Sequence, residues 1–137
     1  MKKSPPILIL LLSLISIAAL PAQGRYPLVA VVVDSKLSQS DIRKLERELE
    51  RATQREGFRA DYAVTSRYGS SNDYDYVVHI DKRRGFNFDE CGFRRDHYEW
   101  RAYNYADRQL GSGHQHRFRN TARDIARTIR YDWRREY

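Results

Sequence analysis

The sequence predicts an α/β domain in which a mixed sheet of four to five strands carries two helices on one face. A run of β-branched residues at 28–33 indicates a buried strand. Two segments, near 40–56 and 121–135, repeat apolar residues at helical spacing, and the segments between them alternate apolar and polar residues as half-buried strands do. The predicted order is β-α-β-β-β-β-α, and the first two strands are parallel because a helix connects them.

Residues 1–24 have the layout of a secretory signal peptide. Lysines at positions 2 and 3 precede an apolar run over 7–20, and small residues follow it up to Gly24. This run is shorter than the roughly 20 apolar residues that a membrane-spanning helix needs. We expect cleavage before Arg25, or alternatively after Ala22. Residues 25–137 would then form a single domain, not integral to the membrane, in the periplasm or outside the cell.

The first strand reads LVAVVV, and an amphipathic helix over about 40–56 follows it. Ser38 and Asp41 have the spacing of a capping box, and Gly57 supplies the left-handed residue that commonly ends a helix. The apolar face of this helix consists of Ile42, Leu45, Leu49 and Ala52.

Four further strands are predicted before the second helix. Residues 58–65 form a half-buried strand, 67–73 a loop, and 74–81 a strand with one apolar face. We interpret 82–92, which mixes charges with glycines and phenylalanines, as an excursion between strands. A strand near 97–105 and a last strand near 113–118, joined by a turn at 107–113, complete the sheet. The predicted inward residues are Tyr74, Tyr76, Val78, Ile80, Tyr98, Trp100 and Ala102.

The C-terminal helix is predicted to begin with a capping box at Thr121 and Asp124. Its buried stripe consists of Ala122, Ile125, Ala126, Ile129 and Trp133. A second stripe places four guanidinium groups along one side of the helix, at Arg123, Arg127, Arg130 and Arg134. If Asp124 and Asp132 do not neutralise this row, it can hold an anionic partner through bidentate hydrogen bonds, although most charged helix faces are simply solvated.

Charge is unevenly distributed along the domain. Residues 25–81 carry a net charge of −1 and residues 82–137 a net charge of +6, and arginines far outnumber lysines. The basic second half favours acidic partners such as anionic lipid headgroups or polysaccharides. The alternative is an arginine-rich composition whose charges are paired internally with Asp and Glu.

Histidines offer a weak metal-binding signal. His114 and His116 are two apart in a predicted strand and so share a side, and further candidate ligands are His97, His79, Asp89, Glu90 and Cys91. No paired Cys or His motif with ligand spacing supports a site, so we expect neither a metal nor another cofactor. Cys91, the only cysteine, is expected to be shielded or incidental, although a free reactive thiol or a link to another chain stays open.

No arrangement of residues indicates catalysis. The sequence has no Gly-x-Ser-x-Gly motif, no phosphate-binding glycine loop and no base positioned around Cys91. Its aromatic residues are better explained by half-buried strands than by stacking on nucleic acid. We therefore expect neither an enzyme nor a nucleic-acid-binding protein.

Several segments resemble small α/β domains of the bacterial envelope, such as the amino-terminal domain of TolB and LpoB. They are 29–33, Gly57-Phe58, 75–80, 103–107 before 110–113, and 123–129. The chain departs from these domains at 82–92, in lacking a threonine-glycine pair after Asp107, and in having no lipid-attachment cysteine. The resemblance implies an adaptor that docks another envelope protein and has no catalytic residues.

The function favoured by the sequence is that of an exported, non-catalytic binding domain that docks another envelope component. The expected contact surfaces are the arginine row, the exposed edge of the sheet, and the excursion with Phe86 and Phe88. The alternative function is binding to a polyanion or an anionic membrane surface through the basic half. The oligomeric state stays open.

Overall fold

The computed structural model describes residues 25–66, 73–88 and 94–136. The expected signal peptide at 1–24 lies outside these ranges, and so does Cys91. The elements in chain order are β1 (Leu28–Val33), α2 (Gln39–Arg55), β2 (Asp61–Thr65), β3 (Tyr76–Phe88), β4 (Arg94–Asn104), β5 (Gln109–Gln115) and α3 (Phe118–Glu136). The α/β class and the predicted order of elements are confirmed.

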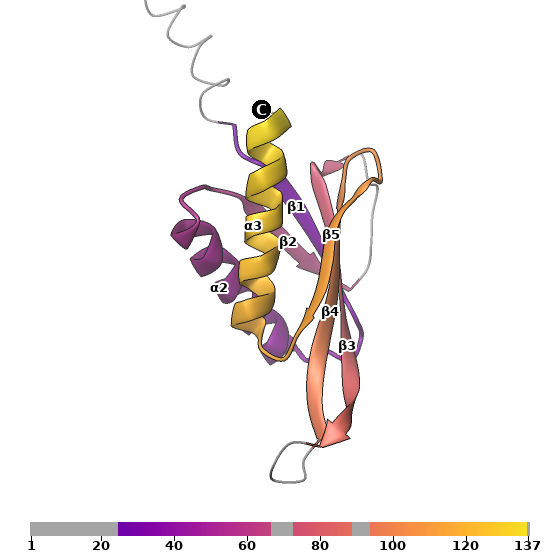
Figure 1. The fold of residues 1–137 in the computed structure, drawn as a ribbon. Helices are drawn as coiled ribbons and strands as arrows, with labels where there is room; N and C mark the ends of the chain where they lie inside the picture. Colours follow the sequence, from indigo (N-terminus) through magenta and orange to yellow (C-terminus); the bar gives the residue numbers. More distant parts are fainter. Residues whose placement is uncertain (1–24, 67–72, 89–93, 137) are drawn as a thin grey trace, which may run out of the picture.

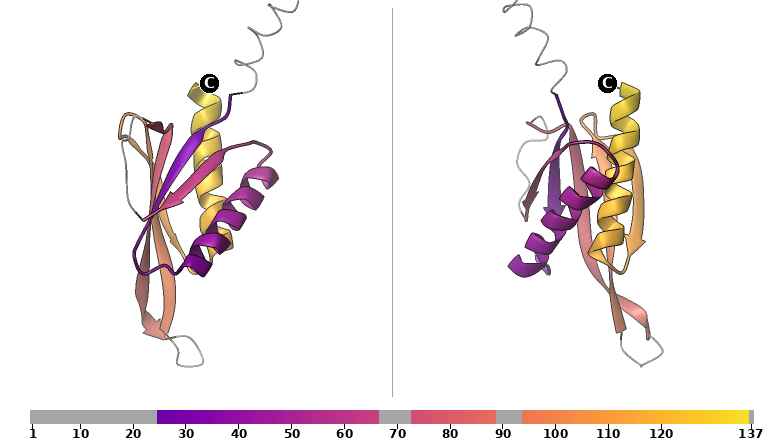
Figure 2. Two further views of the ribbon diagram at one scale, coloured as in Figure 1. Left: turned by 180° about the vertical axis from the view of Figure 1, so that it is seen from behind. Right: turned by 90° about the vertical axis from the view of Figure 1, so that its left-hand side faces the viewer.

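The strands form one mixed sheet in the order β2-β1-β3-β4-β5. β1 is parallel to both β2 and β3, whereas β3–β4 and β4–β5 are antiparallel pairs. Both helices lie on the same face of the sheet, and α3 packs beside α2 (Figures 1 and 2). No helix within the described residues has the length and apolar character needed to cross a membrane.

The core fills the space between the sheet and the two helices. The strands contribute alternate residues and the helices contribute their apolar stripes, as the periodicity predicts. Its largest fully buried aliphatic side chains are Val29, Val31, Leu45, Leu49, Val78, Ile80, Ile125 and Ile129. Tyr76, Trp100 and Ala102 also face this core, whereas Tyr74 precedes β3.

α2 has the ends that its sequence predicts. The Asp41 backbone N–H donates to Ser38 Oγ at 3.1 Å, and the Ser38 N–H donates to the Asp41 carboxylate at 3.3 Å, which confirms the capping box. Gly57 follows the helix with a φ of 74°. Near this end, the buried Thr53 hydroxyl shares a hydrogen bond with Tyr62 of β2, and burial raises the pKa of Tyr62 to about 12.

The predicted excursion at 82–92 is wrong as far as residue 88, because β3 continues to that position. The extension pairs with β4 so that charged residues of one strand lie near opposite charges of the other. Two ion pairs join the strands, Lys82–Asp96 at 3.8 Å and Arg83–Glu99 at 3.4 Å. The mixed charges of this segment, which we interpreted as a sign of a loop, instead form ion pairs between two solvent-exposed strands.

The last strand and the last helix begin earlier than predicted. The turn after β4 ends at Arg108 and has Asp107 in the left-handed region at a φ of 59°. α3 begins at Phe118, and the ring of this residue stacks on Tyr98 at a centroid distance of 4.4 Å. Burial of the Phe118 ring therefore favours a first helical turn that lies before the predicted start at Thr121. Thr121 therefore lies inside the helix, where its hydroxyl donates to the Arg117 carbonyl instead of capping.

Two glycines of β5 make room for the Trp100 indole beneath α3. Gly113 lies opposite Trp100, and a Cβ at Gly113 would lie 2.8 Å from Trp100 Nε1. A Cβ at Gly111 would lie 3.2 Å from Cγ2 of Thr128 in α3. The indole is 4% exposed, so it has little room to move aside. These glycines set how closely α3 approaches β5.

Gly113→Ala is expected to lower the free energy of unfolding by about 1–3 kcal/mol, the usual cost of overpacking. Urea denaturation measures this change. Ser112→Ala, in the same strand and on its exposed face, is the matched control and should change stability by less than about 0.5 kcal/mol. An unchanged midpoint for Gly113→Ala would contradict the packing of Trp100 against β5.

Candidate docking groove

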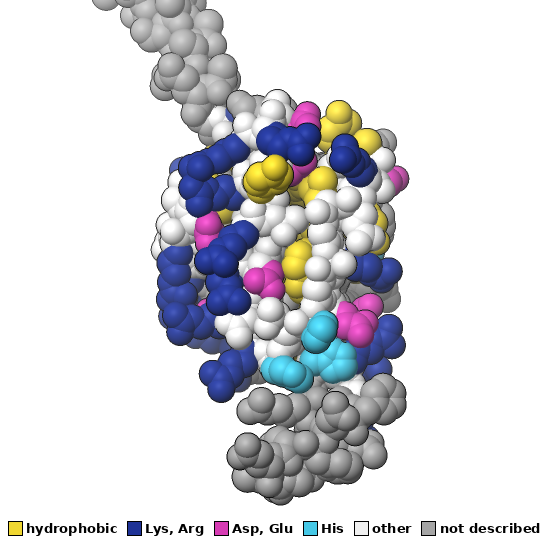
Figure 3. Space-filling model, in the orientation of Figure 1, with side chains coloured by type: hydrophobic (Ala, Val, Ile, Leu, Met, Phe, Trp, Pro, Cys, Tyr) yellow, Lys and Arg dark blue, Asp and Glu magenta, His cyan; other side chains and the backbone are white. Residues whose placement is uncertain are grey.

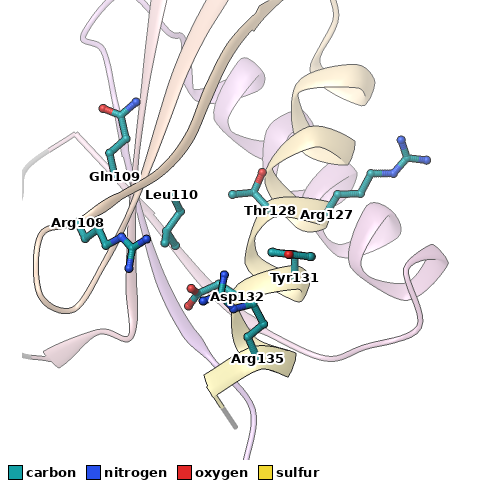
Figure 4. Close-up of a pocket in the computed structure, with 8 residues that line it drawn as sticks. All are labelled: Arg108, Gln109, Leu110, Arg127, Thr128, Tyr131, Asp132 and Arg135. Atoms are coloured by element: carbon teal, nitrogen blue, oxygen red, sulfur yellow. The ribbon is translucent and has the colours of Figure 1, made fainter.

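A groove of about 360 Å³ separates the C-terminal half of α3 from the start of β5. Arg127, Tyr131 and Arg135 lie along one side of α3 at spacings of four residues, and Arg108 and Leu110 face the helix from the opposite wall (Figure 4). The guanidinium of Arg127 points away from the groove (Figure 4). The groove therefore combines the charges of Arg108 and Arg135 with an aromatic ring and an aliphatic side chain.

A register shift between β4 and β5 places Leu110 in this wall. Ala102 pairs with Gly111 but Tyr103 pairs with Gln109, so Leu110 is an extra residue in β5. Strict alternation would turn Leu110 to the face opposite Gly111, whereas it packs against the core. Bulges commonly re-aim a side chain in this way. The result is an apolar surface in the wall of a charged groove.

Asp132 is fixed in the groove by a hydrogen bond from the core. Tyr76 is buried, and its hydroxyl donates to the Asp132 carboxylate at 2.8 Å. Tyr131, which precedes Asp132 in α3, is 69% exposed, and the Arg135 guanidinium lies 5.9 Å from its ring centroid. The groove thus has an anchored carboxylate inside and an exposed aromatic-cationic pair at its rim.

A second hollow of about 250 Å³ adjoins this groove and shares Arg108 and Asp132 with it. Tyr105, in the turn between β4 and β5, lines it and is 67% exposed. Tyr105 and Tyr131 are large side chains that remain in solvent although the domain has a well-filled core. Arginine and tyrosine are residue types that are enriched in protein–protein interfaces.

The predicted arginine row is present on α3, but two of its members are paired with Glu56 from the end of α2. Arg127 Nε donates to one Glu56 oxygen at 2.8 Å and Arg130 Nη1 to the other at 3.0 Å. Arg123 lies 3.5 Å from Asp124, which also accepts a hydrogen bond from Gln115. Arg134 is exposed. Lysine and arginine side chains nevertheless gather along the side of the molecule that carries α2 and α3 (Figure 3).

Glu56 pairs with both Arg127 and Arg130, and this role is not evident from the sequence. The hydrogen bond from Arg127 is the largest cause that lowers the pKa of the Glu56 carboxyl, Arg130 lowers it further, and burial opposes both. A lowered pKa in the folded state means that the ion pairs stabilise the fold at neutral pH, and that this contribution disappears as pH falls through the folded pKa. Glu56 therefore links α2 to α3 more strongly when it is ionised.

Glu56→Gln is expected to lower the free energy of unfolding at neutral pH by up to about 1 kcal/mol, because both arginines are partly exposed. The difference from the native chain should shrink on acidification, since protonated Glu56 also lacks a charge. Thermal unfolding across a pH series measures it. Glu46→Gln, on the exposed face of α2, is the control. A difference independent of pH would show that charge is not the cause.

The other predicted contact surfaces are only partly described. Phe86 and Phe88 lie in the backbone of β3, and Phe88 pairs with Arg94, but their side chains are outside the described part of the structure. β2 and β5 are the two edge strands of the sheet.

The histidines separate into two groups. His97 has its ring centroid about 6 Å from those of His114 and His116, whereas His79 lies against Tyr103 at 5.8 Å. Burial is the largest cause that lowers the pKa of His79, the charge of Arg101 adds to it, and Asp81 opposes it. In the described ranges no three side chains of His, Cys, Asp or Glu converge closely enough to hold a metal ion as they stand. Asp89, Glu90 and Cys91 lie outside those ranges.

The sequence contained a signal for the groove. Tyr131 lies outside the buried stripe of α3, in one column with Arg127 and Arg135, and a large aromatic residue at such a position is solvent-exposed. The participation of Arg108, Leu110 and Asp132 could not be inferred, because it depends on how α3 is placed over β5.

No protein-family model and no curated protein matches the sequence. Among solved structures, the chain is similar to two PelC dodecamers from Paraburkholderia phytofirmans. One, a leucine-to-methionine variant, has 13% identity and a TM-score of 0.40 over 74% of this chain and 84% of that one. The other has 11% identity and a TM-score of 0.37 over 74% and 83%. This likeness is distant. The predicted resemblance to the TolB domain and LpoB stays a prediction.

Proposed function

We propose that residues 25–137 act as an exported, non-catalytic binding domain that docks another protein of the cell envelope through the groove between α3 and β5. The observation that carries this proposal is the exposed pair of Tyr131 and Arg135 at the rim of a groove whose opposite wall contains the aliphatic side chain of Leu110. Exposed aromatic residues beside arginine are typical anchors of protein interfaces.

The groove defines the chemistry of the partner. Arg108 and Arg135 favour carboxylates, because guanidinium groups bind them in a bidentate manner. Leu110 and the ring of Tyr131 favour an apolar or aromatic side chain next to these carboxylates. We therefore propose that the partner presents a short acidic segment containing one large apolar residue. Docking needs no rearrangement of Asp132, because Tyr76 already holds it.

Site-specific photo-crosslinking in the producing cell tests this function. A photoreactive residue in place of Tyr131 is expected to give an adduct with one envelope protein. The same residue in place of Arg47, which is exposed on α2, is the control and should not give this adduct. Arg108→Ser combined with Arg135→Ser should abolish the Tyr131 adduct, because the partner loses both cationic contacts. Equal adducts at both positions, or none at Tyr131, would contradict the proposal.

A second candidate function is binding to an anionic polymer or membrane surface, and it rests on the cationic side of α2 and α3 in Figure 3. In this domain the ion pairs with Glu56 consume part of that charge. Binding through the remaining arginines would be governed by long-range charge, so it would weaken strongly with salt. An interface with aromatic and aliphatic contacts would lose much less.

Glu56→Gln distinguishes the two functions, because it removes the charge that pairs with Arg127 and Arg130 and replaces no residue that lines the groove. A charge-driven binder should then elute from immobilised heparin at higher salt than the native chain. Glu46→Gln adds the same net charge elsewhere on α2 and serves as the control. If the two variants elute together, the arginine row of α3 is not a specific polyanion site.

A further inference from the structure

Three of the four histidines lie together at one end of the β4–β5 pair. His97 belongs to β4, His114 to β5, and His116 directly follows β5. The His97 ring centroid lies 6.0 Å from that of His114 and 6.2 Å from that of His116. Histidine side chains form a contiguous patch on the surface (Figure 3). His114 and His116 are exposed and His97 is half-buried, so the patch is accessible to solvent.

The register of β4 and β5 produces this patch. Glu99 pairs with His114 and Tyr98 with Gln115, so His97 comes opposite His116. Because Tyr98 and Trp100 face the core, the alternation of the strand turns His97 and Glu99 to the face that no helix covers. The three imidazoles and one carboxylate thus occupy the four corners of a cross-strand square.

The hydrogen bonds of these residues suit metal coordination. His116 Nδ1 lies 3.3 Å from the backbone carbonyl oxygen of Asp96, so an N–H at that position leaves Nε2 free as a ligand. Histidines that bind metals usually donate their other N–H to a carbonyl or carboxylate in this way. His97 Nε2 lies 3.4 Å from the Glu99 carboxylate, which brings a nitrogen and an oxygen donor to the same point.

We propose that His97, His114 and His116, with Glu99, form a binding site for a divalent transition-metal ion such as Zn²⁺. Three imidazoles and a carboxylate supply a four-coordinate set of ligands that zinc accepts. Zn–N distances of about 2.0–2.1 Å imply ring centroids roughly 5 Å apart, so the His97–His114 and His97–His116 pairs must each close by about 1 Å. Rotation of the exposed side chains of His114 and His116 supplies this movement.

The proposed site is open to solvent, so an ion can reach it, but a nearby guanidinium group repels the ion. A shallow hollow of about 380 Å³ opens beside His114 and Glu99. Arg83 also lines it, and its Nε lies 3.4 Å from the Glu99 carboxylate. The ion must therefore compete with Arg83 for Glu99. Removing this guanidinium should strengthen binding, because Glu99 loses its competing partner and the repulsion of the ion falls.

Titration calorimetry with zinc chloride tests the site. The protein is isolated as the cell produces it, through a tag without histidine, and is treated with a chelator beforehand. The native chain should bind one Zn²⁺ per molecule with micromolar or tighter affinity. His97→Asn and His114→Asn should each weaken binding at least tenfold, and Arg83→Gln should strengthen it. His79→Asn, which alters the one histidine outside the patch, should leave it unchanged.

The decisive variant is His97→Asn, because His97 is the only one of the three histidines that β4 supplies. Unchanged zinc affinity in this variant would show that His114 and His116 bind the ion by themselves, and it would overturn the proposed cross-strand site. Absence of saturable binding by the native chain at sub-millimolar zinc would overturn it equally. Circular dichroism and thermal unfolding without metal check that each variant folds. If His97→Asn does not fold, Glu99→Gln, also in β4, decides between the two outcomes: weaker zinc binding supports the cross-strand site, and unchanged binding overturns it.

Discussion

The burial of Trp100 against β5 fixes the register between β4 and β5, and both candidate sites follow from that register. Trp100 of β4 enters the core opposite Gly113, where a side chain of any other residue would meet the indole. A slip of β4 by one residue would turn Trp100 to solvent and would turn His97, Glu99 and Arg101 towards the face that the helices cover. The combined cost of exposing an indole and burying these polar and charged side chains therefore selects one pairing. The groove and the histidine patch are formed by residues that this pairing aligns.

α3 packs on the same strand pair but is also held by groups far away in the sequence. Thr128 packs against Gly111, Tyr76 binds Asp132 through its hydroxyl, and Glu56 pairs with two arginines. These contacts come from β5, β3 and the end of α2, so the helix is fixed at several points along its length. Because its last turns are fixed, the wall of the groove is preformed and little entropy is lost when a partner docks.

The two proposed sites use different parts of the domain and different physics. The groove lies on the helical side and offers guanidinium groups beside an aromatic ring. The histidine patch lies where β4 and β5 expose their other face, and it offers imidazole nitrogens around one carboxylate. Several arginines form ion pairs within the domain and are therefore not free to bind a partner. Their carboxylate partners are Glu56, Asp75, Asp81 and Glu99. The net charge of the domain therefore overstates the positive charge that is available to bind an anionic partner.

Local periodicity was enough to predict the order of elements, the capping box of α2 and the buried stripe of α3, because these features depend on residues within one or two turns or on simple alternation. The predictions for 82–88 and for the start of α3 are wrong, because cross-strand ion pairs and the stacking of Phe118 on Tyr98 outweigh the local signals. The sites could be predicted only in part, from the exposed position of Tyr131 on its helix and from the spacing of His114 and His116 in one strand. Glu56 and Arg127 are 71 positions apart, and the extra residue Leu110 exists only relative to its partner strand. Such contacts arise when the whole domain packs around Trp100 and α3, and no single segment encodes them.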